Sequence, residues 1–100
     1  MIANPGTKTF TITGGSNGGA TYFSIEANQY NGYVSAYFYC INASGNWTVN
    51  QVTRTTSGTA PTITITNNNS ATVTVAVNVN SSYSGGFITI DMSLNYISVA

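Results

Sequence analysis

Hydrophobic and polar residues alternate strictly along two neighbouring stretches in the second half of the chain, residues 61–66 and 71–79. In the first stretch Ile63 and Ile65 alternate with threonines, and in the second every other residue is a valine. The connector between them, residues 67–70, contains only Asn and Ser. A period of two, carried by β-branched residues and interrupted by polar ones, predicts an antiparallel hairpin with one buried face.

The same period recurs along most of the chain. It predicts further strands over residues 8–13, 20–26, 33–41, 47–52 and 87–99. In the strand over 47–52, Val52 falls out of phase, which indicates a bulge near Gln51. The run over 87–99 is the longest, and its inward side chains are predicted to be Ile88, Ile90, Met92, Leu94 and Tyr96.

Polar and glycine-rich segments separate these strands. Residues 14–19 read GGSNGG and predict a flexible hairpin loop. Residues 28–32 contain Asn31-Gly32, which is typical of a tight turn. Residues 53–60 are polar and irregular and predict a long surface loop, as do residues 81–86.

Seven to eight short strands with regularly spaced turns predict an all-β fold, either an antiparallel β-sandwich or a jelly roll. Residues 1–7 contain Pro5 and Gly6 and are predicted to form an extended N-terminal arm. Residues 8–100 then form a single β-sandwich domain, which suits a chain of 100 residues.

Charged residues are rare. Lys8, Arg54, Glu26 and Asp91 are the whole set, 4% of the chain, whereas typical domains have about 25%. Asn, Thr and Ser together supply 40 of the 100 residues. Two basic residues cannot neutralise a run of phosphates, which argues against nucleic acid as a partner. The lack of a long apolar run argues against membrane insertion.

The residues needed for most catalytic chemistry are missing. The chain has no histidine and a single cysteine, which excludes a serine or cysteine protease triad and argues against a metal site or any other cofactor. Cys40 is interpreted as a small buried thiol. Glu26 and Asp91 are the one candidate pair for glycoside hydrolysis, but both lie on predicted outward faces, so we expect solvated charges and no catalytic residue.

Tyrosine is abundant, with seven residues in the chain. Tyrosine offers apolar area with a polar tip and is enriched at interfaces, so an oligomer interface or a sugar-binding surface is predicted at Tyr33, Tyr37, Tyr39 and Trp47. Polar loops at the ends of a sandwich are candidate receptor contacts, which gives Asn28, Gln29, Tyr30, Asn31, Arg54 and Tyr83. Rows of alternating threonines also fit an ice-binding surface, although plain β-propensity explains them.

One stretch suggests a family. The segment GNWTVNQVTRTTSGTAPTITITNNNSATVTVAVNVN, followed by FITIDMSLNY, resembles small β-sandwich modules of bacteriophage virions. Such modules occur at tail-fibre tips and as capsid decoration or head-fibre proteins, often as trimers of jelly-roll or C1q/TNF-like shape. The likeness covers residues 33–96 and implies a fold and a setting, but no functional residue.

The resemblance implies a non-enzymatic virion structural protein, a homotrimer that contacts other virion proteins and a host surface glycan or receptor. The N-terminal residues lack the pattern of a secretory signal, so we expect synthesis in the host cytoplasm and assembly into the virion. The alternative is a cell-surface adhesin or carbohydrate-binding module. An enzyme is the third hypothesis, and it requires Glu26 and Asp91 to converge in a cleft.

Overall fold

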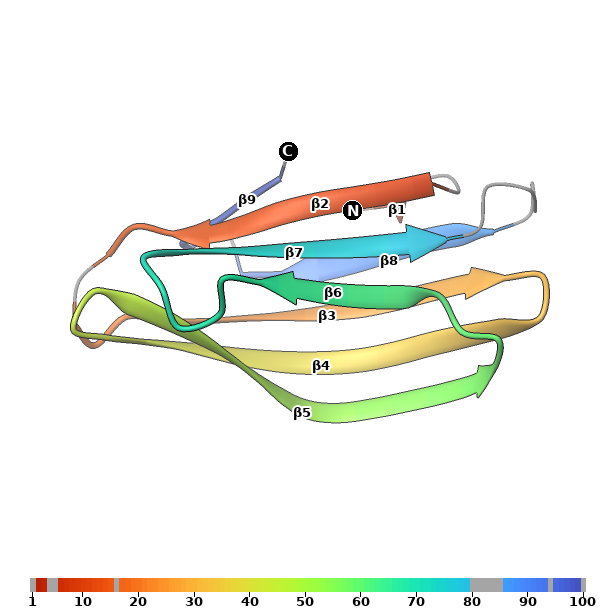
Figure 1. The fold of residues 1–100 in the computed structure, drawn as a ribbon, viewed down its shortest axis with the longest axis horizontal. Coiled ribbons are helices and arrows are strands. Elements are labelled where there is room, and N and C mark those ends of the chain that lie inside the picture. The colour runs from red at the N-terminus through yellow and green to blue at the C-terminus, as the bar shows by residue number, and fades with distance from the viewer. Residues whose placement is uncertain (1, 4–5, 16, 80–85, 94, 100) are drawn as a thin grey trace.

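The computed structural model describes residues 2–3, 6–15, 17–79, 86–93 and 95–99, which form a pair of antiparallel sheets packed face to face (Figure 1). The five-stranded sheet has the order β1-β8-β3-β4-β5 and the four-stranded sheet has the order β6-β7-β2-β9. Their bounds are β1 (Ile2–Ala3), β2 (Gly6–Thr13), β3 (Ala20–Gln29), β4 (Gly32–Ala43), β5 (Asn46–Gly58), β6 (Thr62–Thr66), β7 (Thr72–Val79), β8 (Phe87–Met92) and β9 (Ile97–Val99).

The predicted all-β sandwich is therefore confirmed, and the described residues contain no helix. They form nine strands, of which β1 and β9 span only two and three residues. In the predicted N-terminal arm, Ile2–Ala3 pairs with β8, and Gly6 and Thr7 are the first residues of β2. The molecule is elongated, with principal extents of 41 × 24 × 20 Å.

The hairpin predicted over residues 61–79 is confirmed as β6 and β7, which pair from Thr62 opposite Asn78 to Thr66 opposite Thr74. All four valines of β7 are buried. Ile63 and Ile65 of β6 are partly buried and pack against the core. The two-residue period thus places one face of this hairpin against the other sheet, as alternation in a half-buried strand requires.

The core lies between the sheets and has an aromatic centre. Phe10 on β2 meets Phe23 on β3 edge to face at 4.9 Å between ring centroids, which joins the two sheets. Phe23 in turn stacks on Phe38 of β4 at 4.7 Å. Aliphatic side chains surround these rings and are buried: Ile12, Ile25, Val34, Val49, Val73, Val75, Val77, Val79, Ile88 and Ile90.

The single strand predicted over residues 87–99 is wrong. The run forms β8 in the five-stranded sheet and β9 in the four-stranded sheet, so the chain changes sheets between Met92 and Ile97. Tyr96 has a positive φ of 69° and is 38% exposed, so it does not continue the inward face. Leu94 lies outside the described residues.

The glycine-rich residues 14–19 do not form a hairpin loop. They connect β2 of one sheet to β3 of the other. Ile12 and Thr21, on either side of this segment, are both buried.

The surface loop predicted over residues 53–60 is also wrong, because β5 continues to Gly58 and pairs with β4 as far as Gly32. Every residue from Asn50 to Thr59 is exposed. A strand with neither face buried needs no alternation, which is why the pattern did not show it. The predicted bulge is confirmed: Phe38 pairs with Gln51 and Tyr37 with Thr53, so Val52 is the extra residue.

Candidate functional site

The outer face of the five-stranded sheet exposes a set of large apolar side chains. We call it the tyrosine face, and its members, each 38–46% exposed, are Tyr22, Tyr33, Tyr37, Tyr39, Ile41 and Phe87. The other large exposed apolar residues among those described, such as Tyr30 and Val52, lie in a turn and at the bulge. Several large apolar side chains exposed on one face of a small domain are typical of an interaction surface.

The register of β3 and β4 explains how this face arises. Tyr22 lies directly opposite Tyr39, and Ser24 lies opposite Tyr37, so these side chains share one side of the sheet. The rings of Tyr22 and Tyr37 stack at 6.2 Å with an interplanar angle of 20°. Alternation places Phe23 and Phe38, the neighbours in sequence, on the buried side. Both faces of these two strands are therefore aromatic.

A hollow of about 360 Å³ lies on the same face, over β3, β4 and β8. Its side-chain walls are Tyr33 and Phe87, which flank Asn28 in one row across the three strands. Glu26 and Ser35 form the next row. The Asn28 Oδ1 atom accepts a hydrogen bond from the Phe87 backbone N–H at 3.0 Å. This bond holds Phe87 of β8 against β3, the strand that lies between Phe87 and Tyr33. The hollow thus has two aromatic walls and one carboxylate.

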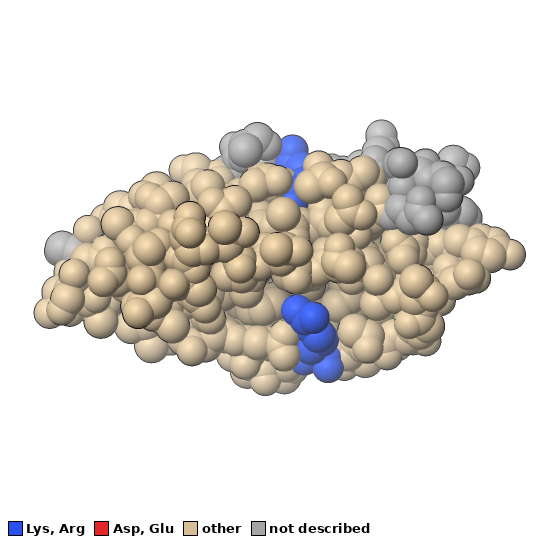
Figure 2. Space-filling model, in the orientation of Figure 1, with Lys and Arg blue, Asp and Glu red and all other residues tan. Residues whose placement is uncertain are grey.

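The charged residues are segregated. Glu26 and Asp91 are both exposed on the outer face of the five-stranded sheet, where Glu26 pairs with Thr89 and Asp91 with Ser24. The view of Figure 2 shows two separate basic patches and no acidic atoms. Glu26 and Asp91 are diagonal neighbours on an open sheet surface, and the hollow includes Glu26 without Asp91. The two carboxylates thus lie on the same sheet surface as the tyrosine face.

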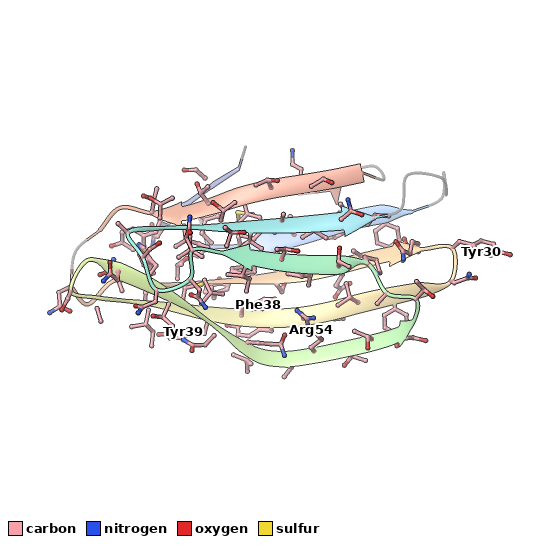
Figure 3. The ribbon with its side chains drawn as sticks, in the orientation of Figure 1. Tyr30, Phe38, Tyr39 and Arg54 are labelled. Carbon is pink, nitrogen blue, oxygen red and sulfur yellow. The ribbon has the colours of Figure 1, made fainter. Side chains whose placement is uncertain are left out.

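The basic residues lie at the rims of the sandwich. Arg54 is exposed and pairs with the buried Ala36, so it lies on the side of β5 that faces the four-stranded sheet. In Figure 3 its side chain projects from β5 across β4 toward β6. Lys8 is on β2 and is half-buried.

The prediction that Trp47 belongs to an interface or ligand surface is wrong. Trp47 is fully buried, its ring lies 5.0 Å from that of Tyr96, and its Nε1–H donates a hydrogen bond to the Gly14 carbonyl at 2.9 Å. Trp47 is opposite Asn42, which is also buried. A tryptophan with a partner for its one N–H is suited to a core, and here it closes the end of the sandwich beneath residues 14–19.

The candidate receptor loops are only partly loops. Asn28 and Gln29 belong to β3, and Arg54 belongs to β5. The hairpin turn between β3 and β4 consists of Tyr30 and Asn31, and Tyr30 lies at the far end of the molecule, 75% exposed (Figure 3). Tyr83 lies outside the described residues.

Along the edge of β5 that faces away from β4, the backbone groups have hydrogen-bond partners among the described residues near Trp47 and Val49. The connector between β6 and β7 pairs with it there: Asn68 accepts from the Val49 N–H at 2.8 Å and donates to the Val49 carbonyl at 3.2 Å. The Trp47 N–H donates to the Ser70 carbonyl at 2.7 Å. Beyond Val49, β5 has β4 as its only neighbour in the sheet order of the described strands, so residues 50–58 form an open, exposed edge.

The outer face of the four-stranded sheet is polar. Threonines of β2, β6 and β7 lie opposite one another there, as in the pairs Thr11 with Thr74 and Thr66 with Thr74. The Thr13 and Thr72 hydroxyls are 2.9 Å apart. The two outer faces of the sandwich therefore differ: one carries hydroxyls and the other carries aromatic rings. The ice-binding interpretation of the threonine rows stays a hypothesis.

Cys40 is buried in the core, as predicted, and burial raises the pKa of its thiol to about 12. No group of three or more metal-ligating side chains occurs among the described residues. Over the same residues, no helix is long and apolar enough to cross a membrane.

The sequence-based prediction found half of the tyrosine face. Tyr33, Tyr37 and Tyr39 are on it, whereas Tyr22, Ile41 and Phe87 were not identified. Tyr22 and Ile41 have the same outward parity along their strands as the predicted residues, which was available from the sequence. Phe87 could not be placed without knowing that β8 pairs with β3.

The fold and this face define a small two-sheet β-sandwich with one aromatic outer surface. Comparison of the chain with protein-family models, with curated proteins and with solved structures gives no match. The resemblance to bacteriophage virion modules therefore stays a prediction.

Proposed function

We propose that this chain is a non-enzymatic structural module of a bacteriophage virion, a capsid decoration or fibre component, which forms a homotrimer through its tyrosine face. The observation that carries the assembly is the tyrosine face itself, six large apolar side chains exposed on one sheet surface. The chain has a net charge of zero and only four charged residues, so net charge repulsion between copies does not oppose association. Burial in a closed oligomer removes it from water. The virion setting rests on the sequence resemblance alone.

Light scattering of the purified chain at micromolar concentration tests the assembly. The expected mass is three times the 10.5 kDa of one chain. Tyr37 lies in the middle of β4 and stacks on Tyr22, so Tyr37→Asn is expected to shift the mass toward the monomer. Tyr30→Asn is the matched control, since it removes an exposed tyrosine from the turn outside the face. A monomeric wild-type chain would contradict the proposed assembly.

A carbohydrate-binding module is the second candidate, and the hollow between Tyr33 and Phe87 favours it. Aromatic rings stack on the apolar faces of sugars, and Glu26, Asn28 and Ser35 supply polar groups for hydroxyls. A glycan array distinguishes the candidates: binding that is lost in Tyr33→Ala supports the module, and the absence of binding by wild type removes it. The enzyme hypothesis is tested on any bound glycan, because hydrolysis that is lost in Glu26→Gln would support it.

A further inference from the structure

We infer that the hollow around Glu26 on the tyrosine face receives the Arg54 guanidinium of a second copy of this chain. The inference rests on the proposed assembly and specifies its contact: the tyrosine face of one protomer packs against the β5 rim of the next. It commits the face to a head-to-tail arrangement, in which each copy contributes two different surfaces.

The chemistry of the hollow fits a guanidinium. Tyr33 and Phe87 line its sides and Glu26 lines the same hollow. A cation over aromatic faces is attracted by their quadrupoles, and arginine is the residue that most often takes this position. The planar guanidinium also pairs with a carboxylate through two parallel N–H donors. A hollow of about 360 Å³ is large enough for this group.

Charge segregation excludes the tyrosine face as its own partner. A two-fold, face-to-face contact would bring Glu26 and Asp91 of both copies into one interface. Neither Lys8 nor Arg54 lies on that face, so the four carboxylates would be close together without a cation. Like charges in a closed interface cost several kcal/mol in general. The complementary surface must therefore carry a base.

Arg54 supplies that base at a rim that is open in the isolated chain. It is exposed and lies on the portion of β5 whose outer edge has no neighbouring strand among the described residues. Val52, two residues before it, is 57% exposed and adds an apolar side chain to the same rim. Lys8 is the weaker candidate, because it is half-buried and because lysine does not present a planar fork.

The contact uses side chains and does not extend the sheet. The bulge at Val52 and the charge of Arg54 are both features that disfavour the addition of a further strand to an exposed edge. These features leave the rim available to a partner that docks onto its side chains, which is what the tyrosine face offers.

A charge-reversal cycle tests the inference. Glu26→Arg and Arg54→Glu are each expected to weaken the assembly by at least tenfold in dissociation constant, measured by sedimentation or light scattering over a concentration series. The double variant restores the pair in reversed order and is expected to recover most of the affinity. Circular dichroism of each variant confirms that it folds.

Two variants serve as matched controls. Asp91→Arg changes the same kind of charge on the same face but outside the hollow, and Lys8→Glu changes the other base. Lys8→Glu is expected to alter the dissociation constant by less than threefold, and Asp91→Arg, which lies on the docking face beside the hollow, is expected to weaken the assembly clearly less than Glu26→Arg does. Equal losses in Asp91→Arg and Glu26→Arg would overturn the hollow as the site, and a double variant as weak as the singles would overturn Arg54 as its occupant.

A second measurement does not depend on assembly of the variants. N-acetylarginine amide is titrated into the Arg54→Glu variant while the ring resonances of Tyr33 and Phe87 are followed by NMR. The expected result is a saturable shift that N-acetyllysine amide produces more weakly and that Glu26→Gln abolishes. An oligomeric wild type whose single variants assemble normally would overturn this inference and leave the proposed function standing, whereas a monomeric wild type would overturn both.

Discussion

At the residue scale, some buried polar atoms of the sandwich lack hydrogen-bond partners within the described part of the chain. Thr21 lies opposite Cys40 on the inward face of β3, is only 2% exposed, and its Oγ1 has no hydrogen-bond partner among the described residues. A buried hydroxyl without a partner costs about 1–3 kcal/mol. The nearby Asn42 is buried as well: its Oδ1 accepts from the Gly45 N–H at 3.0 Å, whereas its Nδ2 also has no hydrogen-bond partner over the same residues.

Replacement of Thr21 by valine keeps the shape of the side chain and removes the unpaired hydroxyl. We expect Thr21→Val to raise the free energy of unfolding by about 1 kcal/mol, measured by urea denaturation. Thr64→Val, on an exposed position of β6, is the control and should change it by less than about 0.5 kcal/mol. A less stable Thr21→Val protein would show that the hydroxyl has a partner in solution.

Because the Cys40 thiol is buried, the free energy of unfolding should fall as the pH rises into the alkaline range. Burial raises its pKa from an ordinary value near 9 to about 12, so the folded state holds this proton more tightly than the unfolded state does. The stabilisation is complete below pH 9 and is lost as the pH rises toward 12. Relative to Cys40→Ala, the free energy of unfolding of the wild type should fall by about 1.4 kcal/mol per pH unit above 9.

Urea denaturation of both proteins at intervals between pH 7 and pH 11 measures this difference. The comparison with Cys40→Ala isolates the thiol, because both proteins contain every other ionisable group. Parallel pH profiles would contradict the burial of the thiol.

At the scale of elements, the connector between β6 and β7 acts as a clamp. It belongs to the four-stranded sheet, yet Asn68 and Ser70 pair with the edge of β5 in the other sheet. Asn67 and Asn69 have positive φ values of 60° and 64°, which asparagine tolerates better than most residues and which turn the connector toward that edge. The asparagines of this segment thus have a structural use beyond hydration.

We expect Asn68→Ala to lower the free energy of unfolding by about 1–3 kcal/mol, because its side chain makes two hydrogen bonds to the Val49 backbone and accepts a third from the Asn69 N–H. Thermal and urea denaturation measure the loss. Asn50→Ala is the control, since the Asn50 side chain makes one long contact of 3.5 Å to the Thr48 carbonyl and is exposed. Equal stabilities for the two variants would contradict the clamp.

The elements also show how far the sequence could be interpreted. Alternation predicted the buried faces of β2, β3, β4 and β7 because each has one side against the core. It did not separate β8 from β9, because the apolar alternation that begins at Ile88 runs on to Tyr96, whereas the structure changes the inward parity to Ile97 in β9. It missed the second half of β5, including Arg54, because neither face there is buried.

The candidate site was predictable to a similar degree. Tyr33, Tyr37 and Tyr39 follow from the outward parity of a single strand. The hollow around Glu26 joins residues from three strands, and its geometry depends on the pairing of β3 with both β4 and β8. Strand order is set by long-range contacts, which a local pattern does not encode.

At the scale of the whole molecule, one outer face exposes large apolar side chains and the other does not. Burial of the apolar face in the proposed trimer should therefore stabilise the folded chain. In a trimer, unfolding is coupled to dissociation, so the midpoint of thermal unfolding depends on protein concentration. A hundredfold rise in concentration, from 1 to 100 μM, adds about 2 kcal/mol per chain by mass action. For a domain of this size the midpoint should rise by roughly 10 °C.

Differential scanning calorimetry at the two concentrations measures the effect, and Tyr37→Asn supplies the comparison. Because this variant is expected to be monomeric, its midpoint should not move with concentration, even if it lies below that of the wild type. The slope with concentration therefore isolates assembly from the intrinsic stability of the fold. A wild-type midpoint that is the same at both concentrations would show that the tyrosine face stays in water, and the homotrimer would have to be abandoned.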